Sequence, residues 1–106
     1  MSLDIYLVRK GVAVFEANIT HNLANMADAA HLYIPMWKPN EYDLFKARDV
    51  LPFLRLGALY MLNEKEKLLK YNPPNGWGNY DILLECVKQY MRACNDNKKA
   101  IIEVSR

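Results

Sequence analysis

The sequence predicts an α+β fold in which a three-stranded antiparallel or mixed sheet is covered on one face by three to four helices. Two alternating apolar runs, LDIYLVR over residues 3–9 and VAVFEANI over 12–19, flank a Lys-Gly pair and are typical of a β-hairpin. The closing run AIIEVSR is rich in β-branched residues and predicts a third strand. Helical patterns lie between these strands, so the expected order is ββα(αα)αβ.

The first two helices are expected over residues 21–33 and 50–62. Pro35 is expected to end the first helix, because the residue before a proline avoids the helical region. Asp49 is a plausible N-cap of the second, which would place Pro52 in the first turn, where no hydrogen bond is lost. This second helix is apolar nearly all round, so it is expected to be either central or partly covered by a partner chain.

Two further helical segments follow. Residues 64–70, EKEKLLK, predict a short charged piece. From Tyr80 to about Asn95 the apolar residues fall on one side and the charged residues on the other, as in an amphipathic helix. No repeat or linker divides the chain, and 106 residues suit a single domain over residues 1–106.

Composition narrows the class of protein. The chain is 52% hydrophobic and 25% charged, and it has neither a signal-peptide-like N-terminal stretch nor an apolar run of roughly 20 residues. We therefore expect a cytoplasmic protein without a membrane partner. Cys86 and Cys94 lie about 12 Å apart along one helix, too far for a disulfide, and are expected to be reduced. A net charge of +2, without basic clusters interleaved with aromatic residues, does not favour nucleic acid.

The stretch NITHNLANM, residues 18–26, is the first candidate binding site. Thr20 is a good N-cap, and the positive end of the following helix would attract an anion. Capping alone is the simpler alternative for this stretch. In the binding interpretation the additional polar groups are Asn18, His21, Asn22 and Asn25.

The second candidate is YNPPNGWGNYD, residues 71–81. The Pro and Gly residues predict a tight loop, and Asn79 is a candidate cap for the last helix. Trp77 is either a stacking platform for a planar ligand or a plug that closes the core. The residues of this loop that would contribute to a ligand site are Asn75, Gly76, Trp77, Gly78 and Tyr80.

Catalytic and metal-binding patterns are sparse. The chain has no Cys-x-x-Cys, no HExxH, no phosphate-binding glycine loop and no GxSxG motif. His21 and His31 lie about 15 Å apart along one helix and could not share a metal ion. A general base at His21, paired with Asp28, Glu16 or Asp81, is the one catalytic alternative. No cofactor and no metal are expected.

The motifs ITHNLANMADAAHLY, MWKP, NPPNGWGNYDILLECVKQYMRAC and IIEVSR cover nearly the whole chain. Together they resemble a family of short, mostly uncharacterised bacteriophage and prophage proteins. His31 departs from that pattern, which has a small residue, often Gly, at this position. Lys38 also departs, because Arg is commoner there and would read an anion bidentately. The resemblance implies an accessory role in the cytosol of a bacterial host.

The polar stretches predict a non-enzymatic protein that binds a small anionic, nucleotide-like ligand. The resemblance implies a phage-type accessory protein, for which sequestering a host defence signal is one expected use of such a site. Lys38 joins the two polar stretches in lining the expected pocket. The first alternative is a protein–protein interaction module that inhibits a host protein or forms a homo-oligomer through Leu56, Leu59 and Tyr60, beside the aromatic 33–45 loop. The second alternative is a small hydrolase or transferase that uses His21.

Overall fold

The N-terminal hairpin and the C-terminal strand form one antiparallel sheet, as the sequence predicted. In the computed structural model, which describes residues 1–106, the central strand is β1 (Ser2–Arg9). It pairs antiparallel with β2 (Val12–Thr20) and with β3 (Ile101–Ser105), so the strand order is β2-β1-β3. The fold is therefore α+β with the order ββα…αβ.

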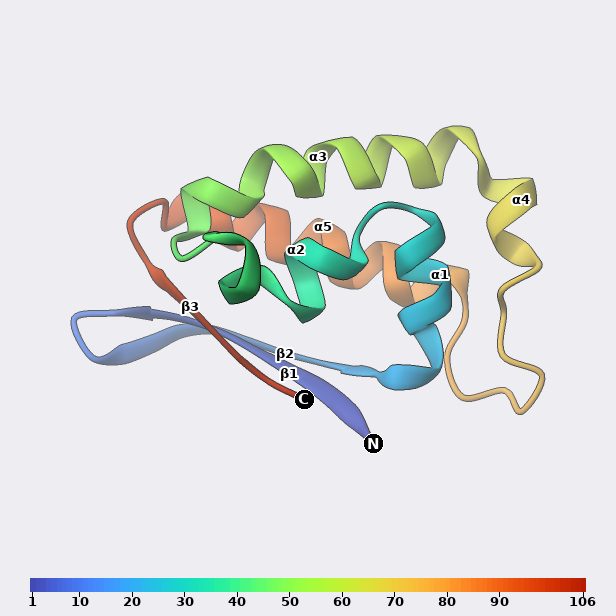
Figure 1. Cartoon of the computed structure of the whole chain (residues 1–106), viewed down its shortest axis with the longest axis horizontal. Helices are drawn as coiled ribbons and strands as arrows, with labels where there is room; N and C mark the ends of the chain where they lie inside the picture. The colour runs from blue at the N-terminus through green and yellow to red at the C-terminus, as the bar shows by residue number, and fades with distance from the viewer.

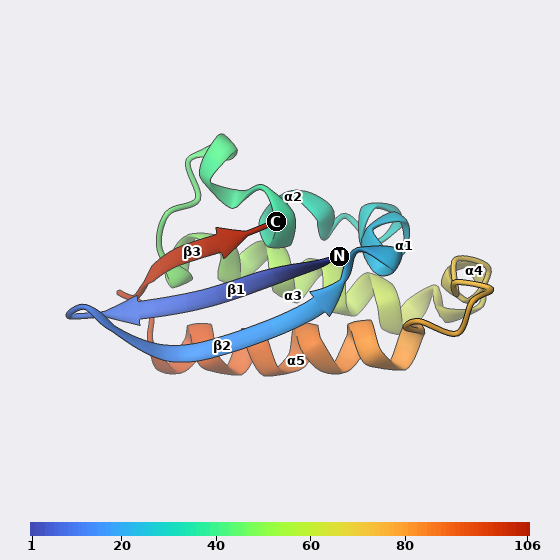
Figure 2. The same cartoon turned by 90° about the horizontal axis from the view of Figure 1, so that it is seen from below.

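The sheet has a helical face and an open face because its side chains alternate. Leu3, Ile5 and Leu7 of β1 are buried against the helices, whereas Asp4 and Tyr6 point to the other face and remain partly exposed. Figure 1 shows the helices stacked on one side of the sheet, and Figure 2 shows the opposite side with the three strands in front of α3 and α5.

The helical layer is built from five α-helices and two 3₁₀ turns. The two long helices, α3 and α5, pack against each other, and α5 lies along β2. No helix combines the length and the hydropathy that crossing a membrane requires. In chain order the elements are η1 (His21–Leu23), α1 (Ala24–Ala29), α2 (Tyr33–Trp37), η2 (Pro39–Tyr42), α3 (Ala47–Asn63), α4 (Lys65–Leu69) and α5 (Tyr80–Asp96).

The prediction of one helix over residues 21–33 was wrong. The segment is a 3₁₀ turn followed by the short helix α1, which ends at a Schellman motif. In this motif the Leu32 N–H donates to the Ala27 carbonyl at 2.7 Å, and the His31 N–H donates to the Asp28 carbonyl at 3.1 Å. His31 takes the left-handed conformation, with φ of 64°, that glycine usually supplies at this position.

Pro35 does not end a helix, contrary to the prediction. It is the third residue of α2, where a residue of the first turn has no intrahelical acceptor and the missing N–H is not needed. Proline is tolerated at this position because a separate short helix begins just before it.

The predicted start of α3 was also wrong. The helix begins at Ala47, and Asp49 is a first-turn residue whose carboxylate accepts from the N–H groups of Lys46 at 3.0 Å and Phe45 at 3.3 Å. Pro52 consequently lies in the second turn, where the carbonyl of Arg48, an exposed residue, loses its usual intrahelical donor. The boundaries expected for α4 and α5 were close to the observed ones.

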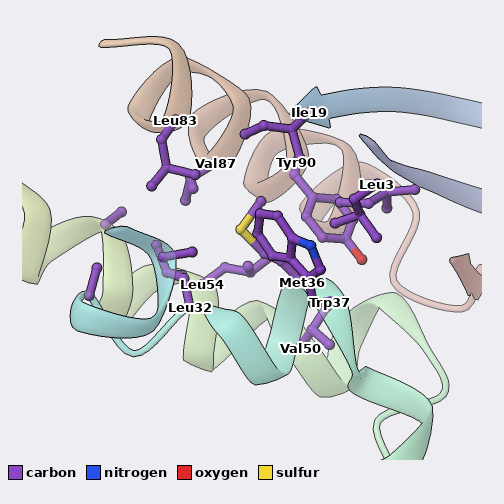
Figure 3. Packing of buried hydrophobic residues seen from close by; sticks show 14 of the residues in the cluster. Leu3, Ile19, Leu32, Met36, Trp37, Val50, Leu54, Leu83, Val87 and Tyr90 are labelled. Carbon is purple, nitrogen blue, oxygen red and sulfur yellow. The ribbon is translucent and has the colours of Figure 1, made fainter. Parts of the chain in front are cut away.

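One hydrophobic core joins the sheet to the helices. Trp37 and Tyr90 are its largest fully buried side chains, and Figure 3 shows both rings directed into the cluster. Gly57 lets α3 approach Leu32, the N-cap of α2, closely, because a Cβ at this position would collide with the side chain of Leu32. This contact places the start of α2 beside α3.

Candidate functional site

The two polar stretches singled out in the sequence lie next to each other. A Cβ on Gly78 would come within 2.9 Å of the Thr20 Cγ2 and 3.0 Å of the Leu23 Cγ. Gly78 has φ of 106°, so glycine suits both the backbone conformation and the close approach. The spatial requirement of the pocket hypothesis, that residues 18–25 meet residues 75–81, is therefore met at this contact.

Two N–H groups at the start of the first helical segment already have hydrogen-bond acceptors within the protein. Thr20 is the N-cap, as predicted, and its Oγ1 accepts from the Asn22 N–H at 3.2 Å. The His21 N–H donates to the Met1 carbonyl at 3.3 Å. Because η1 has three residues and α1 six, the segment does not supply the long helix dipole that the anion hypothesis assumed.

His21 has a structural bond inside this junction. Its Nδ1 accepts a hydrogen bond of 3.0 Å from the indole Nε1–H of Trp37, which ties η1 to α2. An Nδ1 that accepts from Trp37 is not available to receive a proton from a substrate. No carboxylate is hydrogen-bonded to this imidazole, so the geometry does not show the acid–base pairing that an enzyme would need.

Asn18 faces a hollow of about 540 Å³ between β2 and α5. Its Nδ2 donates to the Ser2 Oγ at 2.8 Å and to the Asp4 Oδ1 at 2.7 Å. Asn79 lines the same hollow and caps α5, as predicted, by accepting from the Ile82 N–H at 2.9 Å.

The hollow is acidic. Glu16, Asp81 and Glu85 line it, and no Lys, Arg or His side chain does. These carboxylates take no part in either of the two ion pairs of the protein. An anionic ligand placed here would meet like charges, whereas a neutral or cationic group would not.

The remaining residues of the first stretch, and Lys38, lie outside this hollow. Asn25 lines a shallow depression formed with α1 and α2, and Asn22 is exposed without a side-chain hydrogen bond. The Lys38 ammonium lies 5.7 Å from the centre of the Tyr33 ring, which stacks on Trp37. Lys38 is therefore held in an aromatic cluster on α2 rather than in the expected pocket.

The NPPNGWG loop is shaped by hydrogen bonds within the loop. The Asn75 side-chain Oδ1 accepts from the Trp77 N–H at 2.9 Å, and the N–H of Gly76, which has φ of 75°, donates to the Pro73 carbonyl at 3.2 Å. Trp77 is 70% exposed, so it does not close the core as a plug.

Tyr80 is the buried aromatic residue next to this loop. Its hydroxyl donates to the Met61 carbonyl at 2.6 Å, and burial raises its pKa above the ordinary tyrosine value. Tyr80 therefore joins α5 to α3 and is not presented to a ligand.

The sequence interpretation missed a cleft of about 360 Å³ between α2, η2 and α3. Apart from the His31 imidazole, its walls are apolar or aromatic. The only hint in the sequence was the aromatic 33–45 loop, because the cleft forms where that loop folds against α3. Its lining residues are His31, Ile34, Pro35, Tyr42, Leu44 and Phe53.

The outer face of α3 carries apolar side chains that continue from this cleft. Phe53, Leu56 and Leu59 are 48%, 66% and 55% exposed. Tyr60 is half-buried, and the His31 ring meets it edge-on at 5.2 Å. We call Phe53, Leu56, Leu59 and Tyr60 the α3 stripe.

Comparison with known proteins gives no relative. No family model, no curated protein and no solved structure matches the chain. The resemblance to phage proteins stays a prediction. No group of His, Cys, Asp or Glu side chains in the fold has a metal-binding arrangement.

Proposed function

We propose that the protein is a protein–protein interaction module that pairs with a second copy of itself through the α3 stripe. The exposure of Phe53, Leu56 and Leu59 on the side of α3 away from the core carries this proposal. In Figure 1, α3 runs along the edge of the molecule with no other element over its outer side. Contiguous exposed apolar surface of this kind is typical of protein-binding faces.

The cleft beside the stripe supports the same proposal. It offers an apolar recess next to Phe53, into which a side chain of a second molecule could insert. His31 lines this recess from a left-handed backbone conformation that costs a non-glycine residue roughly 1–2 kcal/mol. Strain of this kind concentrates at functional positions, and His31 also braces Tyr60 of the stripe.

A twofold arrangement suits the residues of α3. When two copies of the helix lie antiparallel with Leu56 on the axis, Phe53 of each copy faces Leu59 of the other.

The mass of the protein in solution tests the proposal. Sedimentation velocity of the full chain is expected to show a monomer–dimer equilibrium, and Leu56→Glu is expected to shift it to monomer. Val12→Glu is the matched control, because Val12 is equally exposed, at 63%, but lies on the hairpin far along the chain from α3. This control variant should dimerise as the natural chain does.

A chain that stays monomeric up to about 1 mM, where an association free energy of only about 4 kcal/mol would already be visible, overturns self-association. A host protein would then be the partner to seek for this face, in keeping with the accessory role that the phage resemblance implies.

A small anionic ligand between the two polar stretches is supported only by the contact of Gly78 with Thr20. Two observations count against such a ligand: the nearby hollow has an acidic lining, and Lys38 lies outside it. A thermal-shift screen with nucleotides and cyclic dinucleotides tests it, with Trp77→Ala as the comparison. Stabilisation that disappears in Trp77→Ala would restore this function, and a flat screen would remove it.

A further inference from the structure

A groove between α3 and α5, separate from the acidic hollow and the apolar cleft, is lined by three cationic side chains. Arg55 comes from α3, whereas Lys88 and Arg92 come from α5. The groove has a volume of about 340 Å³, and its remaining walls are Leu51, Met91 and Asn95. Neither polar stretch of the sequence analysis contributes to it.

Helix geometry makes the cations converge. Lys88 and Arg92 are four residues apart and therefore project from the same side of α5. Arg55 reaches across from α3, and its Nη2 donates to the Asn95 Oδ1 at 3.4 Å. Leu51, one turn before Arg55, is only 4% exposed and forms an apolar floor.

The cations of the groove have no anionic partner in the protein. The two ion pairs of the chain, Lys67 with Glu64 and Arg106 with Glu41, lie elsewhere. No carboxylate lines the groove. Asp96, one turn beyond Arg92, and Glu85, one turn before Lys88, make no ion pair with these cations. Like charges held at helical spacing repel one another, so a bound anion would remove an unfavourable interaction as well as add favourable ones.

We propose that this groove binds a compact polyanion that carries phosphate groups. Arg55 and Arg92 offer planar guanidinium groups suited to bidentate contact with phosphate oxygens, and Lys88 adds a point charge. Because the Asn95 carbonyl oxygen already accepts from Arg55, its amide N–H groups remain free to donate. Leu51 and Met91 can cover an apolar part of the same ligand.

The groove suits a small molecule better than a nucleic acid. Its volume lies at the lower end of the range of about 300–1,000 Å³ typical of small-molecule sites. No aromatic side chain lines it, although grooves that track a single strand generally use aromatic rings as stacking platforms. The net charge of +2 is also small for a nucleic-acid-binding protein.

Calorimetric titration of the full chain with inorganic tripolyphosphate tests the site. Binding is expected for the natural protein, and the double variant Lys88→Gln, Arg92→Gln is expected to weaken it by at least about tenfold for each charge-assisted hydrogen bond lost. The matched control is Lys67→Gln, Lys70→Gln, which removes the same charge from exposed positions on and after α4. This control should bind with nearly unchanged affinity.

The proposal does not depend on self-association, since Lys88 and Arg92 lie on α5 and outside the α3 stripe. If both double variants bound tripolyphosphate equally weakly, the affinity would depend only on the net charge of the protein, and the proposed site would be overturned. Absence of tripolyphosphate binding at low salt would do the same. A single-stranded oligonucleotide that binds more tightly than tripolyphosphate, with affinity rising with its length, would replace the proposal with a nucleic-acid surface.

Discussion

The hydroxyl of Tyr90 lies inside the core without a hydrogen-bond partner. Its ring stacks on Phe15 of β2, with 5.6 Å between the ring centres. Burial raises the pKa of this phenol well above its ordinary value. The ring therefore contributes apolar packing, while the oxygen adds the cost of a buried polar group that has lost water.

Replacing this residue should stabilise the protein. Tyr90→Phe keeps the ring against Phe15 and removes the unpaired oxygen, so we expect the free energy of unfolding to rise by about 1 kcal/mol. Urea unfolding followed by circular dichroism measures the change.

The same substitution at Tyr80 serves as the control with the opposite sign. The Tyr80 hydroxyl donates to the Met61 carbonyl at 2.6 Å, so Tyr80→Phe should lower the free energy of unfolding by about 1 kcal/mol. A destabilised Tyr90→Phe variant would contradict the assignment of an unpaired hydroxyl.

Single residues also mark how far sequence patterns could predict the site. Thr20 and Asn79 were predicted as caps because capping depends on local chemistry that the sequence displays. Trp37 and Trp77 both lie near Pro or Gly, yet one is buried and bonded to His21 while the other is 70% exposed. That difference depends on which tertiary surface meets each ring, and no local pattern contains it.

At the scale of elements, the close contact between the two polar stretches depends on the missing side chain of Gly78. Gly78→Ala would add a Cβ about 3 Å from atoms of Thr20 and Leu23, at a positive φ. We expect the left-handed backbone, which alanine disfavours, to lower the free energy of unfolding of this variant by about 1–2 kcal/mol. Overpacking should lower it by a further 1–3 kcal/mol or so.

Gly76→Ala separates these two costs. Gly76 has a similar positive φ of 75°, and nothing lies within 4 Å of the Cβ position. This variant should lose only the conformational part, so urea unfolding of the two variants compares strain with packing directly. Equal losses would mean that Thr20 and Leu23 accommodate the added Cβ without cost, and would contradict the expected overpacking.

The strands were more predictable than the first helices. Period-two alternation marks residues 3–9 and 12–19, and the Lys10–Gly11 pair between the two runs suits the observed turn. The prediction of one helix over 21–33 was wrong because the sequence shows no sign of the Schellman motif that ends α1. His31 stands where glycine is usual, and the apolar spacing continues through the break. Glycine is the residue that this backbone conformation favours.

For the whole molecule, the arrangement of charge emerges only from folding. Helix α5 meets β2 at the acidic hollow and meets α3 at the cationic groove. Arg55 and Lys88 are far apart in sequence and belong to segments of mixed charge, so neither segment indicated a basic site. Helix packing, rather than composition, brings them together.

The stability of the whole fold should also depend on alkaline pH. Burial raises the pKa of the Cys86 thiol to about 11 and that of Cys94 to about 12, against an ordinary value of 9.0. The folded protein therefore holds protons that the unfolded chain releases above pH 9. This contribution to stability is fully present below pH 9 and is lost as the pH rises toward 11 and 12.

Urea unfolding at pH values from 8 to 11 tests this linkage, because the free energy of unfolding should decline above pH 9 by at most about 1.4 kcal/mol per pH unit for each thiol. The Cys86→Ala, Cys94→Ala variant should show a shallower decline, whatever its stability at pH 8. The buried Tyr90 and Tyr80 hydroxyls, whose pKa values are also raised, would account for what remains. An unchanged slope in the double alanine variant would mean that both thiols ionise in the folded protein as readily as in the unfolded chain, and it would contradict this linkage.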